Sequence, residues 1–297
     1  MANRERVRLA TEPGRVLLIA DFKNVVYRST STHASLFSGR TFTGGLYGFM
    51  VSLLRAVRDV QATSVVVATD LQPYVRKQQF SGYKGDRKKN RDPDDPFLLK
   101  SAQSMPLAKA FVECLDLPFW EAEGFEYDDF CAWGAKQFSH RFDRVVAMTN
   151  DSDLYQLFDI DNFTVYRGSE KGLFDRAEFV KEYGELSREE WINVLCMTGT
   201  HNAVPGIEGV GIKTALKAIR DPVAMRNILA KHGDIIERNR PLVALPHASF
   251  KPAQDHRVRR HQFELRDFVR FCTRYEIQVT ARMVEALTDL RQCNGNR

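Results

Sequence analysis

Acidic residues close three short apolar runs in this 297-residue sequence. Asp21 follows the run VLLIA, Asp70 follows VVVAT and Asp151 follows VVAMTN. Continuous apolar runs of this kind indicate buried parallel strands in a sheet that helices cover on both faces. Because the carboxyl ends of parallel strands meet at one edge, where α/β proteins bind their ligands, we expect the three carboxylates to converge there.

Four more acidic residues stand near these strand ends. The segment GFEYDD places Glu126, Asp128 and Asp129 at the start of a predicted helix, and Asp153 comes two residues after Asp151. Glu126 and Asp129 are three residues apart and share a helix face, whereas Asp128 lies about 100° around the helix from Asp129. Taken singly, these residues have a structural explanation, because carboxylates complement the helix dipole and cap helix N-termini.

Together, seven carboxylates at one sheet edge require a compensating cation. Like charges a few ångströms apart raise one another's pKa values and cost stability, and a bound divalent ion reverses that balance. Oxygen ligands without Cys or His partners favour Mg²⁺ or Mn²⁺ over zinc. Such an ion binds phosphate oxygens and activates water, so the pattern predicts a site for phosphoryl chemistry.

A basic segment closely follows the second of these strand ends. Residues 84–91, KGDRKKNR, hold five positive charges against one negative charge. They belong to a polar excursion that is rich in Gly, Pro and charge and also contains aromatic side chains. A charge run is usually a solvated loop, but basic and aromatic residues beside a metal site suit the phosphates and bases of a nucleic acid.

The run PGIEGVGIKT leads into an amphipathic helix. Gly206 and Gly211 have the spacing of a nucleotide-binding P-loop, but Ile212 separates Gly211 from Lys213, so the run fails that motif. It also fails GxGxxG, because Thr214 occupies the last glycine position. What remains is a tight turn with backbone N–H groups at a helix N-terminus, which suits either one phosphate of a duplex or a structural turn between two helices.

In this order the motifs resemble the structure-specific 5′ nuclease family: flap endonucleases, phage 5′-to-3′ exonucleases and the 5′ nuclease domain of bacterial DNA polymerase I. The resemblance covers about residues 15 to 220, and the free-standing length looks most like the phage exonucleases. It implies a PIN-like α/β fold with a mostly parallel sheet, a helical arch and a helix-three-turn-helix motif. It also implies a Mg²⁺-dependent 5′-to-3′ exonuclease or flap endonuclease in DNA replication, in which Mn²⁺ substitutes.

The resemblance assigns roles to individual residues. It implies a first metal ion held by four carboxylates: Asp21, Asp70, Glu126 and Asp128. It implies that three others reach a second ion or its waters: Asp129, Asp151 and Asp153. Catalytic contacts to the scissile phosphate fall to Lys84 and Arg87, at the base of the arch. DNA contacts near the arch fall to Arg76, Tyr83, Lys88 and Lys89. The duplex-binding turn, often with K⁺ bound in this family, comprises Gly206, Gly209, Gly211, Lys213 and Thr214.

One departure concerns the second metal ion. The family usually has Asp-x-x-Asp before Asn-x-Pro-Gly, whereas this sequence has Gly199 and Asn202 at the two acidic positions. Asn202 can offer only a neutral carbonyl oxygen and Gly199 offers no side chain, so we expect a second site that is weaker or is completed by substrate phosphate. This leaves open a DNA-binding protein with weak or lost catalysis. A small-molecule phosphatase shares the carboxylates but explains neither the basic segment nor the glycine turn.

The sequence divides at about residue 185. We expect an α/β metal-dependent nuclease core over 1–185, with an arch excursion over 71–115, and a helical DNA-binding region over 186–297 with a helix-hairpin-helix type motif over 196–219. The substrate would be DNA with a 5′ end, a flap or a nick, and a DNA:RNA hybrid is a further candidate.

The composition is that of a globular protein, with 43% hydrophobic residues, 27% charged residues and a net charge of +5. No run approaches the roughly 18–20 apolar residues of a spanning helix, and the N-terminus lacks the apolar core of a secretory signal. We therefore expect a cytoplasmic protein that binds no membrane, in a bacterial host if it is phage-encoded. Five cysteines without a CxxC pair indicate reduced thiols.

Overall fold

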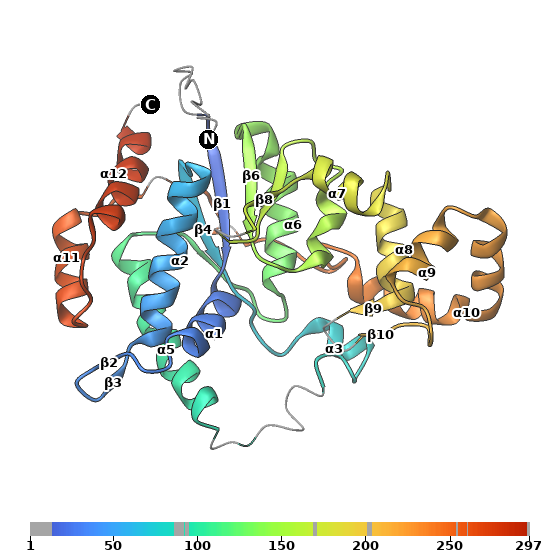
Figure 1. Ribbon diagram of the computed structural model, residues 1–297, viewed down its shortest axis with the longest axis horizontal. Coiled ribbons are helices and arrows are strands. Elements are labelled where there is room, and N and C mark those ends of the chain that lie inside the picture. Colours follow the sequence, from blue (N-terminus) through green and yellow to red (C-terminus); the bar gives the residue numbers. More distant parts are fainter. Residues whose placement is uncertain are drawn as a thin grey trace, which may run out of the picture.

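Each of the three apolar runs forms a strand of one sheet in the computed structural model (Figure 1). They are β1 (Val16–Asp21), β4 (Ser64–Ala68) and β6 (Arg144–Met148). β1 lies between the other two strands and is parallel to both. Their carboxyl ends therefore share one edge of the sheet, as the sequence predicts.

The structure describes residues 14–85, 92, 95–168, 171–200, 204–253, 255–259 and 261–295. Within these residues the main sheet has the order β5-β4-β1-β6-β7-β8, and only β8 runs antiparallel to its neighbour. The outer strands are β5 (Phe119–Trp120), β7 (Phe163–Tyr166) and β8 (Leu173–Phe174). Two short antiparallel pairs lie outside the sheet, β2 (Phe37–Ser38) with β3 (Thr41–Phe42) and β9 (Gly199–Thr200) with β10 (Val204–Pro205).

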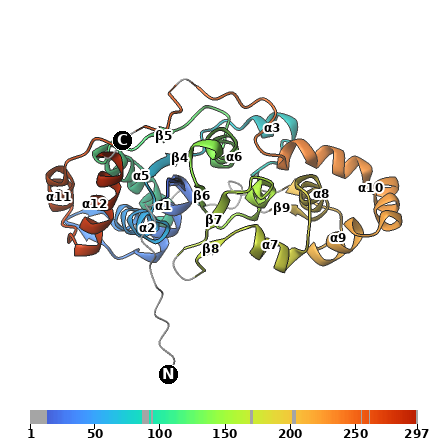
Figure 2. The ribbon, with the colours of Figure 1, turned by 90° about the horizontal axis from the view of Figure 1, so that it is seen from above.

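Alternate side chains of the central strands enter two separate cores. Leu17 and Ile19 face one core, and Leu18 and Ala20 face the other. Helices cover both faces, as Figures 1 and 2 show, which is why the strands are apolar throughout.

One face carries α1 (Phe22–Thr32), α2 (Gly44–Val60) and α5 (Pro96–Cys114). The other carries α6 (Tyr127–Phe138), η2 (Ser152–Leu157), α7 (Arg176–Tyr183) and α8 (Arg188–Thr198). The short helices α3 (Val75–Gln79) and η1 (Ser139–Arg141) lie in connections.

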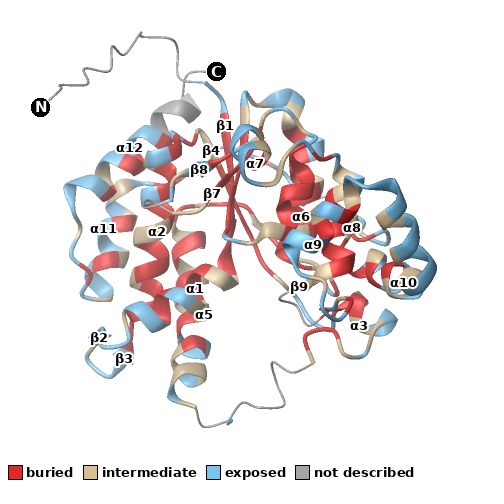
Figure 3. Cartoon of the chain, turned by 45° about the vertical axis from the view of Figure 1, so that its right-hand side comes forward, coloured by how far each residue is buried: buried red, intermediate tan, exposed pale blue. Residues whose placement is uncertain are grey.

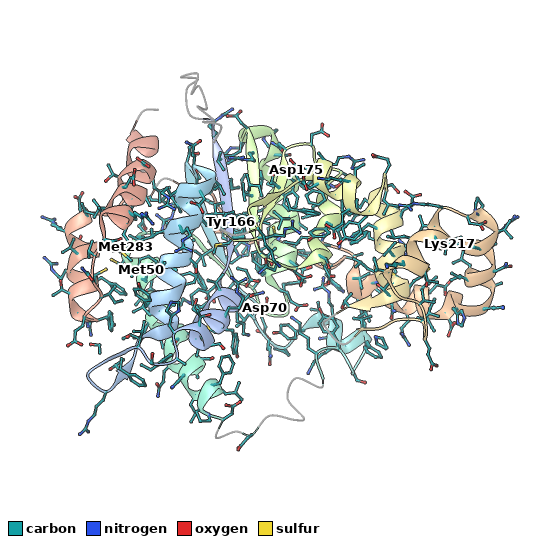
Figure 4. All side chains as sticks on the ribbon, viewed as in Figure 1. Met50, Asp70, Tyr166, Asp175, Lys217 and Met283 are labelled. Carbon is teal, nitrogen blue, oxygen red and sulfur yellow. The ribbon has the colours of Figure 1, made fainter. Side chains whose placement is uncertain are left out.

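The C-terminal region divides between two ends of the molecule. α9 (Ile212–Ile219) and α10 (Pro222–Val243) pack with α8 at one end. α11 (Leu265–Arg274) and α12 (Ala281–Gly295) instead pack on α5 and α2, where Met283 lies beside Met50 (Figure 4). Residues 186–297, expected as one helical region, therefore contribute to both cores.

The connection from α10 to α11, residues 244–264, runs along the β4–β5 side of the sheet, and we call it the strap (Figure 2). Its His256 ring contacts the carbonyl oxygen of Glu121, and the Nε2 atom of His261 accepts the N–H of Val65 at 3.0 Å. The strap therefore provides hydrogen-bond partners for backbone groups along the edge of β4 and β5. Figure 3 shows how completely the sheet is buried compared with the outer surface of α10.

Two expectations from composition can be compared with the described residues. Cys114, Cys131, Cys196 and Cys272 are free thiols there. Among the helices of that part of the chain, none combines the length and the apolar character that crossing a bilayer requires.

Candidate active site

The carboxyl edge of the sheet brings together acidic residues from three strand ends. Asp21 ends β1 and caps α1, accepting the N–H of Asn24 at 3.0 Å. Asp70 follows β4 and accepts the N–H of Tyr127 at 2.9 Å, which joins it to the start of α6. Asp151 follows β6 and caps η2. Figure 4 places Asp70 at the middle of the molecule, below the central strands.

These carboxylates lie close enough to raise one another's pKa values. Burial, followed by the charge of Asp70, raises the pKa of Asp21 to about 8. Burial, followed by the charge of Asp151, raises the pKa values of Asp128 and Asp153 well above the usual range. A site that holds so much unneutralised carboxylate, with only oxygen donors, fits a hard divalent cation.

Asp70 behaves differently because a lysine neutralises it. Burial alone would raise its pKa, but Lys84, the backbone N–H of Tyr127 and Lys23 outweigh burial and lower it. The Nζ atom of Lys84 lies 3.2 Å from Oδ2 of Asp70 and also donates to Oε1 of Glu126. The described residues include no three His, Cys, Asp or Glu side chains already arranged as a ligand set. Lys84 instead contributes the positive charge between Asp70 and Glu126.

Tyr83 points into this site rather than toward the surface. Its side chain is buried, and its hydroxyl donates to Oε2 of Glu126 at 2.7 Å. Burial, followed by the negative charge of Glu126, raises the pKa of Tyr83 well above its usual value, so it remains a donor. The prediction that Tyr83 contacts DNA is therefore corrected, because a buried hydroxyl bonded to Glu126 cannot reach a duplex.

Arg76 and Asp129 also lie elsewhere than predicted. Arg76 was expected at the DNA surface and Asp129 near the second metal ion. Arg76 is 1% exposed and Asp129 is 0% exposed, and they form a two-bond ion pair with N–O distances of 2.7 and 2.8 Å. Both predictions are corrected, because the pair is sealed from DNA and Asp129 is committed to Arg76. The spacing of Glu126 and Asp129 in fact forms a capping box at the start of α6.

The glycine turn lies at the far end of α8. β9 and β10 form a short hairpin, and α9 begins after Gly211, whose carbonyl accepts the N–H of Ala215. Four of the predicted DNA-contacting residues are exposed there: Gly209, Gly211, Lys213 and Thr214. Gly206 is half-buried. Its surroundings leave no room for a Cβ, which would lie 2.5 Å from the Gly199 nitrogen.

One residue that supports the turn is not apparent from the sequence. Asn239 of α10 is completely buried, and its amide donates to the carbonyl oxygens of Cys196 and Pro205, both at 2.9 Å. It thus fixes the end of α8 against the hairpin. Nothing in the sequence distinguishes Asn239 from any other polar residue of an amphipathic helix. The predicted residues Arg87, Lys88, Lys89 and Asn202 lie outside the described residues.

The sequence is similar to proteins of known family. A family model described as the 5'-3' exonuclease, N-terminal resolvase-like domain, matches residues 16–184. A 5'-3' exonuclease of Aquifex aeolicus is 29% identical over 230 residues, which are 76% of each chain. The thermostable DNA polymerase I of Thermus aquaticus is 32% identical over 210 residues, which are 70% of this chain and 24% of the polymerase. The chain therefore spans about a quarter of the polymerases that it matches.

Solved structures support the fold independently. The phage T5 D15 protein crystallised with metal ions superposes with a TM-score of 0.62 at 16% identity, over 94% of this chain and all of that one. The flap endonuclease-1 of Methanococcus jannaschii gives 0.61 at 16% identity, over 95% and 93% of the two chains. At such low identity these two comparisons bear on the fold alone.

Proposed function

The chain belongs to the 5'-3' exonuclease family, and on this premise we propose that it is a metal-dependent nuclease that hydrolyses DNA phosphodiesters near 5′ ends, flaps or nicks. The observation that carries the proposal is the group of carboxylates at the sheet edge, three of which, Asp21, Asp128 and Asp153, have raised pKa values. Burial and mutual repulsion disfavour the charged form of these acids, and a divalent cation bound among them would favour it.

The residues fit Mg²⁺ by their chemistry. Asp21, Asp70, Glu126 and Asp128 would hold a first ion, and Asp151 and Asp153 would reach a second ion or its waters. The chemistry that such an ion supplies when bound is an activated water and neutralised charge on the phosphate. The donors are hard oxygens from strand ends and helix starts, which favours Mg²⁺ or Mn²⁺ over zinc.

Lys84 would stabilise charge at the scissile phosphate. Its ammonium is almost buried, and its pKa is raised because Asp70 and Glu126 outweigh the opposing effect of burial. It therefore stays positive at the Nζ atom at every pH at which the enzyme would work. A preorganised cation at this position contributes on the order of 10²-fold to the rate. Arg87 is proposed for the same phosphate from the sequence resemblance alone.

The hairpin and the start of α9 would hold the duplex at a distance from the chemistry. Exposed Gly209, Gly211, Lys213 and Thr214 offer backbone N–H groups, a hydroxyl and one positive charge at a helix N-terminus, which suits a phosphate of the DNA backbone. α9 and α10 lie to one side of the sheet, as Figure 1 shows, so the DNA would extend from the sheet edge toward them.

Cleavage of labelled DNA tests the proposal. A 5′-end-labelled flap and a nicked duplex are incubated with the wild-type protein in EDTA, Mg²⁺ or Mn²⁺, and DNA binding is measured alongside. We expect short 5′ products only with metal, and loss of cleavage in Asp151→Ala with most DNA binding retained. Asp159→Ala, which changes an exposed acid outside the site, should cleave like wild type.

Two results would point elsewhere. Tight binding without cleavage in any metal would favour a DNA-binding protein whose catalysis was lost with the carboxylates that Gly199 and Asn202 replace. Undiminished cleavage by Asp151→Ala would show that the carboxylates at the sheet edge take no part in the reaction.

A further inference from the structure

The buried Arg76–Asp129 pair joins three parts of the chain that are distant in sequence. Arg76 comes from α3 and Asp129 from the first turn of α6. The Nε atom of Arg76 donates to the carbonyl oxygen of Leu242, near the end of α10, at 3.0 Å. One carboxylate oxygen of Asp129 accepts the N–H of His247 in the strap at 2.7 Å. The pair therefore holds the end of α10 against the sheet edge.

The same pair contacts Glu126, a proposed metal ligand. Nη1 of Arg76 donates to Oε2 of Glu126 at 3.1 Å, and Oδ2 of Asp129 accepts the backbone N–H of Glu126 at 3.1 Å. Asp129 thus fixes the main chain of Glu126, and Arg76 fixes one oxygen of its carboxylate. The other oxygen receives Lys84.

Asp129 has no capacity left for another partner. Oδ1 accepts from Arg76 and from His247, and Oδ2 accepts from Arg76 and from Glu126. These four bonds fill the roughly four acceptor sites of a carboxylate. Burial keeps both side chains from DNA, and the four bonds leave Asp129 no acceptor site for a metal ion.

The positions of the two charges also suit the two helices that they join. Asp129 lies in the first turn of α6, where the helix dipole favours a negative charge, and Arg76 meets the end of α10, where it favours a positive one. A bidentate guanidinium–carboxylate pair has a narrow geometry, so it transmits position as well as charge.

We propose that Arg76 and Asp129 are a positioning pair that links the seating of α10, and with it the duplex-binding hairpin, to the orientation of Glu126. The inference rests on the proposed metal centre, of which it assigns the supporting residues. Asn239 completes the connection, because it lies on α10 and donates to the hairpin at Pro205. Residues that orient a metal ligand typically change metal affinity or activity about 10- to 100-fold when they are replaced.

The test compares two single variants. Arg76→Lys keeps the positive charge but cannot form two parallel hydrogen bonds to the carboxylate, and Asp129→Asn keeps the side-chain shape but loses the negative charge. Mn²⁺ binding without DNA is followed by electron paramagnetic resonance. We expect both variants to lose Mn²⁺ affinity by about 10-fold or more. The double variant Arg76→Met with Asp129→Leu removes both buried charges together, which should cost less stability than leaving either charge unpaired. If the two residues act as one unit, losing both has the same effect as losing either. The double variant should therefore bind Mn²⁺ no more weakly than the single variant with the lower affinity.

Three further readouts separate positioning from direct contact. Amide hydrogen exchange over residues 244–250 should accelerate in both single variants, because the N–H of His247 loses its fixed acceptor. The salt dependence of duplex binding should stay as in wild type, whereas loss of a direct phosphate contact would lower its slope by about 1. On a flap substrate, kcat should fall because Glu126 is misplaced, and KM for DNA should rise because the hairpin is no longer seated, with the salt slope unchanged.

Arg188→Met is the matched control. Arg188 donates from α8 to the carbonyl oxygen of Leu245, so it also holds the strap, but it does not contact Glu126. This variant should bind Mn²⁺ like wild type. Mn²⁺ loss in Asp129→Asn alone, a lower salt slope in Arg76→Lys, or wild-type Mn²⁺ binding in the double variant would each overturn the positioning pair. Failure of the wild-type protein to bind Mn²⁺ would instead count against the proposed function itself.

Discussion

Asp21 shows what the acidic edge costs the fold without a cation. The residue is 8% exposed at the end of β1, and burial, followed by the charge of Asp70, raises the pKa of its carboxyl to about 8. Perturbed acids of this kind cluster at functional sites, where stability is given up for chemistry. An amide could cap α1 equally well, so helix capping alone does not account for an acid at this position.

This cost should be visible in the pH dependence of stability. Because the pKa of Asp21 is about 8 in the folded state and about 3.8 in the unfolded chain, the folded protein holds the extra proton and loses stability as pH rises between these values. In EDTA at pH 7, Asp21→Asn should be more stable than wild type by about 1–3 kcal/mol, and the gap should shrink at pH 5.

Urea unfolding at the two pH values measures this gap. Added Mg²⁺ should narrow it by stabilising wild type, which binds the ion better than the variant. Asp159→Asn, at an exposed acid, should show no gap at either pH. An Asp21→Asn protein that is less stable than wild type at pH 7 in EDTA would contradict the argument.

At the scale of elements, the β9–β10 hairpin explains the missing carboxylate at position 199. Gly199 has a φ of +73°, a region that favours glycine. A Cβ there would overlap the carbonyl oxygen of Val204 and lie 2.6 Å from the Gly206 nitrogen. The two strands approach so closely that the hairpin and a side chain at 199 exclude each other.

Gly199→Asp, which restores the family's acidic residue, should therefore damage the protein. The positive φ at this position should lower the free energy of unfolding by about 1–3 kcal/mol when the residue has a side chain. The overlap of its Cβ with the neighbouring strand should lower it further. Duplex binding should weaken because the hairpin must open. Thermal unfolding and fluorescence anisotropy with a DNA duplex measure the two effects.

Gly209→Asp is the matched comparison. Gly209 has a similar φ of +76°, but no atom lies within 4 Å of the position that its Cβ would take. The difference in unfolding free energy between the two variants therefore measures the cost of the close contact at Gly199. Equal stability of the two variants would show that the overlap is relieved without cost.

Across the whole molecule, the strap ties the two cores together. It begins at the end of α10, passes the Arg76–Asp129 pair and reaches α11, which packs on α5. Its His261 accepts the N–H of Val65 on β4, so the imidazole must be neutral at Nε2 to make this bond. Burial, with a smaller contribution from Arg259 and despite Asp116, lowers the pKa of His261 to about 4.

Acid should therefore loosen the strap. The pKa of His261 is about 4 when folded and about 6.5 when unfolded, so its contribution is complete above pH 6.5 and is lost as pH falls toward 4. The loss approaches about 3 kcal/mol at the acid end. In His261→Gln, an amide oxygen can accept the N–H of Val65 but does not titrate. The free energy of unfolding of this variant, measured in urea, should therefore lack this part of the pH dependence.

Hydrogen exchange at β4 gives the structural readout. Between pH 7 and pH 5, with exchange rates corrected for pH, protection of the Val65 amide should fall in wild type more than in His261→Gln. Identical pH dependence of the two proteins would show that His261 does not hold the strap in this way.

Residue types and spacing were enough to predict the sheet and the edge at which its acidic residues meet. Three apolar runs ending in Asp21, Asp70 and Asp151 predicted the parallel sheet and the edge at which the carboxylates meet, because strand burial and strand direction are local properties of such runs. The order of motifs also indicated the family. Both followed from spacing and residue type, which a linear sequence records.

Packing between distant segments sets which of those residues are available to a metal ion or to DNA. Arg76, Tyr83 and Asp129 have the same residue types as DNA contacts and metal ligands, yet they are buried and bonded inside the protein. Leu242, which contacts Arg76, and His247, which contacts Asp129, each lie more than a hundred residues away along the chain. Whether a charge faces solvent or another charge depends on which distant segments pack over it, and no spacing along the chain contains that information.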